Sequence, residues 1–290
     1  MNIKNMLPYL ESEELLILAR NVLKSRDLVY QGISLKEVLH YIDEDDLNEA
    51  LKSLGEEELE RVFADESIIK PLIRKLDEDD LADLARKITP AHPYLLTLMA
   101  PYLDEDDLRE IAVELMKLGV PVDLPALIPF LDEDGTAECI RCAAEMGEDI
   151  RGLLNDYHVI RNMDEDDLAE IVKKVIPADP SLLVKLAPFL DEDDVGEIAV
   201  QLVRNRRSVN LTELLPFMDE DSIDICFRYA LIRNENWQEY LPFVSKDALH
   251  KLMKDYMAGN ITADFDLIYP FMDEDDIRAL FRYEMNKQKR

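Results

Sequence analysis

The sequence predicts an all-α fold: a right-handed α-solenoid (superhelix) of about ten two-helix repeats. Two observations predict it. An acidic hexapeptide, LDEDDL at residues 76–81, recurs with small changes along the chain, and apolar residues follow each copy at helical spacing. The chain also has 48% hydrophobic residues, enough for a large core, and only 8 glycines, too few for sheets joined by tight turns.

The copies of the hexapeptide set the order of the repeats. We call the first acidic residue of each copy, or its equivalent, position 0. It falls at residues 11, 43, 77, 104, 132, 164, 191, 219, 245 and 273, the copies at 11 and 245 being degenerate. Residues 77–148 also align without a gap with residues 164–235, which indicates an internal duplication. We therefore expect a single continuous helical-repeat domain over residues 1–290.

Each repeat is expected to hold two helices and no strand. Apolar residues recur at +4, +7, +8 and +11, as Leu108, Ile111, Ala112 and Leu115 do, which predicts a helix B of about 12 residues that starts just after position 0. A shorter helix A of about 8 residues precedes it and ends in proline, an aromatic residue and Leu or Met. Three A helices start with capping-box spacing, at Ser34/Glu37, Asn210/Glu213 and Asn236/Glu239.

The acidic motif itself is typical of a helix start. With Asp77 as N-cap, its carboxylate accepts from free amides of the first turn, and the following acids lie at the positive end of the helix dipole. Leu76 and Leu81 occupy the two positions of a hydrophobic staple. A calcium loop is not favoured, because an EF-hand alternates its oxygen ligands around a glycine, whereas these acids are consecutive. Weak cation association along this acidic edge stays open.

Segments such as LIPFLDEDGTAECIRCAAEMG and APYLDEDDLREIAVELMKLG resemble HEAT-like repeats. Arg109 after Leu108 and Arg278 after Ile277 match the arginine of that family's second helix, and Asp104 and Asp273 match its turn acid. Helix A is short for the family, the turn lacks the usual proline, and most repeats have no arginine after the apolar residue. The resemblance implies an α-solenoid that serves as a binding scaffold, with B helices along its concave face.

One column of basic residues stands out in so acidic a chain. Position +9 is Lys or Arg in eight of the ten B helices, on their exposed flank. The alternatives are ion pairs with an acid at +6 of the same helix, ion pairs with the next repeat, or a stripe that binds a partner. The eight candidate partner-binding residues are Arg20, Lys52, Arg86, Arg141, Lys173, Arg228, Lys254 and Arg282.

Composition favours some classes of binding partner and some cellular locations over others. A formal charge of -30 opposes nucleic acid and anionic lipid, and it favours a protein or peptide partner with basic segments. No signal peptide or membrane-spanning run is evident, and three cysteines without framework spacing suit a cytoplasmic protein.

The Cys and His residues that could bind a metal or take part in catalysis are also few. Cys139 falls at a core position, Cys142 lacks a second ligand pair, and the four histidines form no cluster, so we expect no metal site and no cofactor. The first hypothesis is a non-enzymatic protein-binding scaffold. The alternatives are a binder of an anionic or phosphorylated ligand, or of nucleic acid, through the basic column, and an enzyme whose site lies in the groove.

Overall fold

The computed structural model describes residues 3–63 and 65–287 of the chain. These residues fold as helices, apart from one hairpin of two-residue strands, β1 (Val29–Tyr30) and β2 (Ile33–Ser34). The hairpin corrects the expectation of a structure without any strand. Its turn places Gln31 and Gly32 in the left-handed region of backbone conformation, which tight hairpin turns require.

A long helix begins directly after every position 0, as the sequence predicts. These helices are α1 (Ser12–Lys24), α3 (Glu44–Lys52), α6 (Glu78–Ile88), α8 (Glu105–Lys117), α10 (Glu133–Glu145), α12 (Glu165–Val175), α14 (Glu192–Arg204), α16 (Glu220–Arg233), α17 (Lys246–Met257) and α19 (Glu274–Lys287). We call them the B helices.

The segments before position 0 are shorter than a regular helix A. They are η1 (Ile3–Tyr9), α2 (Leu35–Val38), α5 (Glu66–Ile73), α7 (Tyr94–Met99) with η2 (Ala100–Tyr102), α9 (Leu124–Leu127) with η3 (Ile128–Phe130), α11 (Tyr157–Arg161), α13 (Ser181–Leu186) with η5 (Ala187–Phe189), α15 (Leu211–Leu214) with η6 (Leu215–Phe217), η7 (Trp237–Tyr240), and α18 (Phe265–Ile268) with η8 (Tyr269–Phe271).

In five of these segments a turn of α-helix gives way to a 3-10 turn at the recurring triplet of proline, aromatic residue and apolar residue. Pro129 lies in the first turn of η3, and its equivalents occupy η2, η5, η6 and η8. Proline has no N–H to continue the α-helical bonds and its ring crowds the preceding turn, which explains the change of helix type there.

Two insertions depart from a strict pair of helices per repeat. The helix α4 (Glu56–Phe63) lies between α3 and α5, so the stretch from Asp43 to Asp77 holds an additional helix. The turn η4 (Leu153–Asn155) precedes α11 in the same way. Both insertions fall in the longer intervals between neighbouring acidic motifs.

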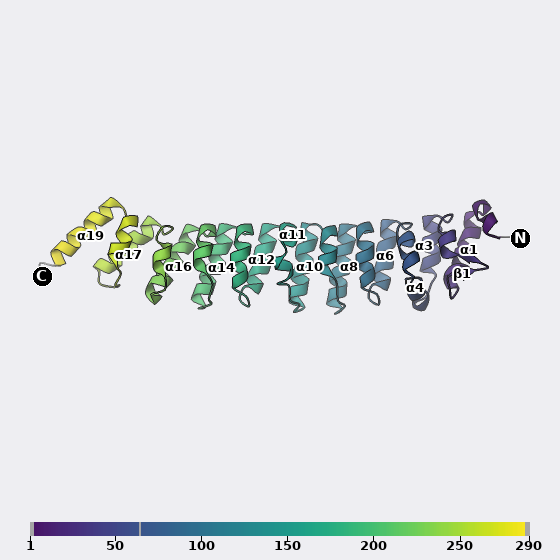
Figure 1. Ribbon diagram of the computed structural model, residues 1–290, viewed down its shortest axis with the longest axis horizontal. Helices are drawn as coiled ribbons and strands as arrows, with labels where there is room; N and C mark the ends of the chain where they lie inside the picture. Colours follow the sequence, from purple (N-terminus) through teal and green to yellow (C-terminus); the bar gives the residue numbers. More distant parts are fainter. Residues whose placement is uncertain (1–2, 64, 288–290) are drawn as a thin grey trace. The chain divides into compact units, whose positions relative to one another are not determined.

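The chain divides into two compact units, residues 1–153 and 154–290. In the first, α1 packs against α3, α6 against α8, and α8 against α10; in the second, α14 packs against α16 and α17 against α19. Figure 1 shows the B helices of each unit side by side in chain order. The predicted stripe is buried, with Leu108, Ile111, Ala112 and Leu115 all at or below 2% exposure.

The acidic motif caps the helices as predicted. In eight of the ten copies the side chain at position 0 accepts a hydrogen bond from an amide of the first turn, at 2.7–2.9 Å. Of the three capping boxes, the one of Ser34 and Glu37 is confirmed. Asn210 and Asn236 make no cap bond, and Asn210 instead hydrogen-bonds the side chain of Glu213.

Removal of one cap should cost little but measurable stability. Asp104→Ala is expected to lower the free energy of unfolding by about 1 kcal/mol, because the amide of Asp106 loses its acceptor. Asp106→Asn is the control: that carboxylate is 73% exposed and only pairs with Arg109, so its effect should stay within about 0.5 kcal/mol. Urea unfolding followed by circular dichroism compares them, and an equal or larger loss for Asp106→Asn would contradict the capping role.

Candidate functional site

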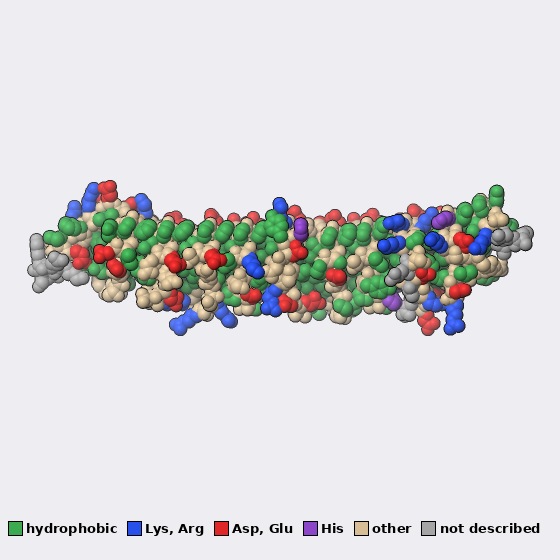
Figure 2. Space-filling view, viewed as in Figure 1, with side chains coloured by type: hydrophobic (Ala, Val, Ile, Leu, Met, Phe, Trp, Pro, Cys, Tyr) green, Lys and Arg blue, Asp and Glu red, His purple; other side chains and the backbone are tan. Residues whose placement is uncertain are grey.

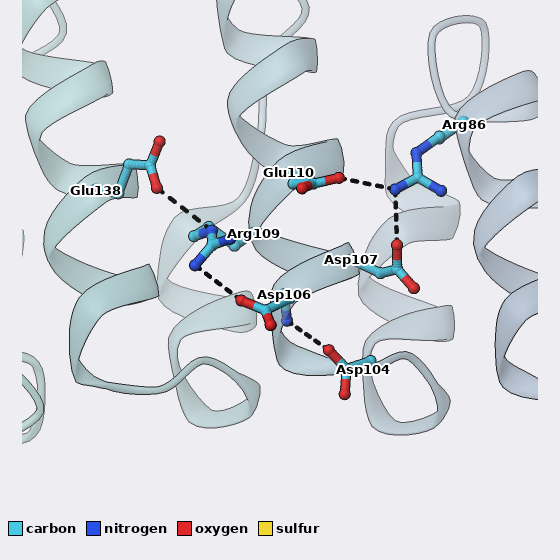
Figure 3. Close-up of polar contacts among 7 residues, drawn as sticks. All are labelled: Arg86, Asp104, Asp106, Asp107, Arg109, Glu110 and Glu138. Carbon is cyan, nitrogen blue, oxygen red and sulfur yellow. Dashed lines mark hydrogen bonds and ion pairs between the residues drawn. The ribbon is translucent and has the colours of Figure 1, made fainter.

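The carboxylates of the acidic motif divide into three groups by what they contact. Those at position 0 cap their own helix. Three at +3, together with three acids at +6, pair with basic side chains of the preceding B helix; they are Asp80, Asp107 and Asp194, and Glu49, Glu110 and Glu197. In Figure 3, Nη2 of Arg86 on α6 lies 2.7 Å from Oδ1 of Asp107 and 3.0 Å from Oε2 of Glu110 on α8. The repeated acids therefore join neighbouring helices.

The basic column at +9 supplies the other half of these pairs. Arg20 pairs with Glu49 at 2.6 Å, Lys52 with Asp80 at 3.0 Å, and Arg228 with Asp255 at 3.5 Å, each on the next B helix.

The duplicated region repeats the arrangement. Lys173 contacts Asp194 at 2.8 Å and Glu197 at 2.9 Å, at the positions equivalent to the two partners of Arg86. Five of the eight predicted residues thus bridge to the following helix, which favours a structural ladder for those five.

Of the alternatives, ion pairs within one helix do not hold for three residues of the column. Lys52, Arg86 and Lys173 bond acids of the next helix, and their own +6 acids, Glu49, Asp83 and Glu170, are not their partners. The next helix brings two carboxylates to Arg86 and two to Lys173, whereas the +6 acid offers one.

The remaining three residues of the column are Arg141, which has a partner, and Lys254 and Arg282. Lys254 and Arg282 are exposed, and within residues 3–63 and 65–287 no carboxylate lies within ion-pair distance of either. These two are the cations of the column that stay available to a partner.

At Val113, one of the two valines at +9, another arginine takes over. Val113 occupies that position on α8, and Arg109, four residues earlier, reaches Oε2 of Glu138 on α10 at 3.3 Å while also contacting Asp106 at 2.9 Å (Figure 3). This is the arginine that carries the HEAT-like resemblance. Its link to the next helix is one rung of the same ladder.

Hydrogen bonds to carboxylates keep the ladder cations charged. The bond to Asp194, followed by that to Glu197, raises the pKa of Lys173 to about 12. Asp107 raises the pKa of Arg86, and Asp80 raises that of Lys52, in both cases first through the side-chain hydrogen bond. Lys52, Arg86 and Lys173 therefore stay cationic throughout the physiological pH range.

The third group of carboxylates makes no such contact. In seven of the acidic motifs, acids at +1 and +2 are exposed, and within the described part of the chain they have no cationic partner. They are Glu44, Asp45, Glu78, Asp79, Glu105, Glu133, Asp134, Glu165, Asp166, Glu192, Asp193, Glu220 and Asp221.

Aromatic rings accompany these free acids. Position -2, two residues before the cap, is Tyr or Phe in eight of the ten repeats. Six of the rings are exposed by 37–85% and two are half-buried. They are Tyr9, Tyr41, Tyr102, Phe130, Phe189, Phe217, Phe243 and Phe271. The sequence analysis did not single them out, although the signal was present in the recurring proline, aromatic and apolar triplet.

We call the rings at -2 and the free acids at +1 and +2 the acidic–aromatic edge. The ring lies just before the capped helix start and the free acids lie just after it, so ring and carboxylate are close in the sequence. In the space-filling view, hydrophobic side chains gather in a row over α8 and α10, with carboxylates along its rim (Figure 2). Large exposed aromatic residues next to charge are the composition of interaction sites.

The two cysteines considered for metal or redox chemistry lie in the core. Cys139 is fully buried as predicted, burial raises the pKa of its thiol to about 12, and Cys142 is also buried. No group of three or more His, Cys, Asp or Glu residues suited to a metal ion occurs in the described ranges. Nδ1 of His250 lies 2.6 Å from Oδ1 of Asp276, so this histidine at +5 takes the place of a ladder cation.

No helix among the described residues is long and apolar enough to cross a membrane. Comparison with protein-family models, with curated proteins and with solved structures gives no match to this chain.

Proposed function

We propose that this chain is a non-enzymatic, cytoplasmic protein-binding scaffold, a right-handed α-solenoid of about ten HEAT-like repeats. Its partner is a protein or peptide with basic segments. The observation that supports this most is the acidic–aromatic edge: free carboxylates and a ring at -2 occur together in five repeats, those of Asp43, Asp104, Asp132, Asp191 and Asp219. Carboxylates attract Lys and Arg, and aromatic faces bind the same cations.

The edge suits an extended partner segment. The neighbouring repeats of Asp104 and Asp132 present the same pair of features, as do those of Asp191 and Asp219, so a chain with basic residues at regular intervals meets two equivalent sites at once within either unit. Linked weak contacts of this kind bind more tightly together than any of them alone. The charge component acts mainly on the association rate and weakens with salt.

The alternative function, binding of an anionic ligand or nucleic acid through the basic column, has less support. Five of its eight residues already hold carboxylates of the next helix. A ligand would have to displace those carboxylates, and the chain's charge of -30 would oppose its approach. Only Lys254 and Arg282 are open to it.

A charge-matched comparison tests the edge. The edge variant combines Glu105→Gln, Glu133→Gln and Asp134→Asn; the control combines Glu57→Gln, Glu114→Gln and Glu148→Gln, which removes the same charge from exposed acids elsewhere in the same unit. The probe is a fluorescein-labelled oligo-arginine peptide, with affinity measured by anisotropy at two salt concentrations. We expect the edge variant to bind at least fivefold more weakly and the control to stay within twofold.

Two outcomes would speak against this function. Equal losses in the edge variant and the control would mean that net charge alone attracts the peptide. Replacement of Tyr102 and Phe130 by serine leaves the charge unchanged, so it measures the contribution of the aromatic rings to peptide affinity. If the two rings can be removed with no loss of affinity, the aromatic half of the edge has no part in binding.

A further inference from the structure

The loop after α14 has an unusual residue at a strained position. Several B helices end in the same way: the amide two residues beyond the C-cap bonds a carbonyl in the last turn, and the residue before it has positive φ, as in a Schellman motif. That residue is Gly119, Gly147 and Gly259 after α8, α10 and α17, and Asn234 after α16. After α14 it is Arg206, with φ of 56°.

An arginine is costly in this conformation. Its Cβ crowds the backbone where glycine has no side chain, and asparagine is the usual substitute. The hydrogen bonds of the cap are intact, from the amide of Arg206 to the carbonyl of Val203 at 3.1 Å and from Arg207 to Leu202 at 2.9 Å. The strain therefore comes with the side chain, and strained residues that persist are often functional.

The duplication shows what the loop otherwise contains. Residues 118–123, LGVPVD, align with residues 205–210, NRRSVN. Gly119 and Val120 in the first copy correspond to Arg206 and Arg207 in the second. The backbone bonds are the same in both copies, so the fold of the loop does not require two adjacent arginines.

Both arginines line a cavity of about 620 Å³. Arg233 of α16 lines it as well, and its guanidinium is held in place: Nη1 donates to the carbonyl of Val203 at 2.9 Å, and the group lies 5.1 Å from the centre of the Tyr229 ring. Ser208, Asn210 and Thr212 add hydroxyl and amide groups to the wall. The volume is that of a typical small-ligand site.

The cavity is lined mainly by basic residues, whereas the chain as a whole is acidic. Three arginine residues line it against one acidic residue, Glu235. Two more acids lie nearby but are engaged, Glu213 with Asn210 and Glu239 with Thr212. In the described ranges, Arg206 and Arg207 have no carboxylate within ion-pair distance, unlike the ladder cations.

We propose that this cavity binds the dianion of a phosphate monoester. Arginine offers paired N–H donors that match two phosphate oxygens, and a second and third arginine can neutralise its two negative charges. The space beyond the arginines accommodates the group that carries the phosphate. The carrier is a phosphorylated small molecule or a phosphorylated side chain, since both present the same group. This site is separate from the acidic–aromatic edge and does not depend on the function proposed for it.

The chain contains its own probe for this site. Its single tryptophan, Trp237, is 5% exposed and follows Asn236, a residue of the cavity wall. Inorganic phosphate and O-phosphoserine are titrated against tryptophan fluorescence and by calorimetry, with serine as the unphosphorylated control. We expect saturable binding of both phosphates and none of serine. Binding should weaken as the pH falls through about 6, where the phosphate loses its second charge.

The aligned copy supplies the test variant. Arg206→Gly with Arg207→Val converts the two positions to the residues of the first copy, and glycine relaxes the strained backbone, so folding should be kept. This variant is expected to bind O-phosphoserine at least tenfold more weakly. The control, Lys254→Gln with Arg282→Gln, removes two exposed cations from the same unit and should change binding less than twofold.

The possible results separate clearly. A phosphoserine peptide that binds more tightly than the free amino acid would identify a protein as the carrier, and equal or weaker binding would identify a small molecule; both support the site. No saturable binding by either method would overturn the proposal. An equal loss in the control variant would overturn it as well, since general charge would then account for binding, and so would equal competition by acetate.

Discussion

Leu108→Ala is expected to lower the free energy of unfolding by about 2–4 kcal/mol, the usual cost of a cavity in a packed core. Leu108 is 0% exposed at +4 of α8, and together with Leu103 it forms the staple around the cap of Asp104. The substitution removes packing against two helices at once, because α8 contacts both α6 and α10. Urea unfolding followed by circular dichroism measures the change.

Leu118 supplies the control for that experiment. It ends the same helix, as the C-cap of α8, but is 69% exposed. Leu118→Ala should therefore change stability by less than about 0.5 kcal/mol. If the two substitutions cost the same, the packing of α8 between its neighbours would have to differ from the arrangement described above.

Gly196→Ala is expected to destabilise the protein by about 1–3 kcal/mol through overpacking. Helix propensity alone predicts the opposite sign, because alanine is about 1 kcal/mol better than glycine inside a helix. Gly196 lies within α14, however, where α16 begins against it. A Cβ at Gly196 would lie 2.6 Å from Cβ of Ser222 and would also collide with the carboxylate of the cap residue Asp219.

The duplicated copy suggests a compensating change. Gly196 and Ser222 correspond in the alignment to Arg109 and Gly135, where the larger residue lies on the first helix and the glycine on the second. A Cβ on Gly135 would be 3.6 Å from that of Arg109. Each crossing of these helices thus has one glycine.

That relation gives the rescue experiment. Adding Ser222→Gly to Gly196→Ala should recover part of the lost melting temperature, since the contacts with Oγ and Cβ of Ser222 are removed while the one with the Asp219 carboxylate remains. Gly152→Ala, with nothing within 4 Å of the added Cβ, is the control and should be close to neutral. A stabilising effect of Gly196→Ala would contradict the close approach of α14 and α16.

The sequence by itself determined where the B helices begin and which of their faces is buried. Asp77 shows the reason: its carboxylate accepts from the amide of Asp80, so the cap is complete within one turn. The stripe at +4, +7, +8 and +11 is equally local, because its spacing alone places these residues on one side of a helix. The caps at position 0 and the buried stripe could therefore be read from spacing, whereas two of the three expected capping boxes do not form.

Only the tertiary structure decided how the helices meet. Lys52 has Glu49 within reach on its own helix, yet it bonds Asp80, 28 residues away, because α6 presents that carboxylate to it. The clash at Gly196 and the cavity beside Arg206 depend in the same way on neighbouring helices. Sequence spacing sets the direction of a side chain from its own helix, whereas its partner depends on the distance and register of the next helix, which packing of the whole unit determines.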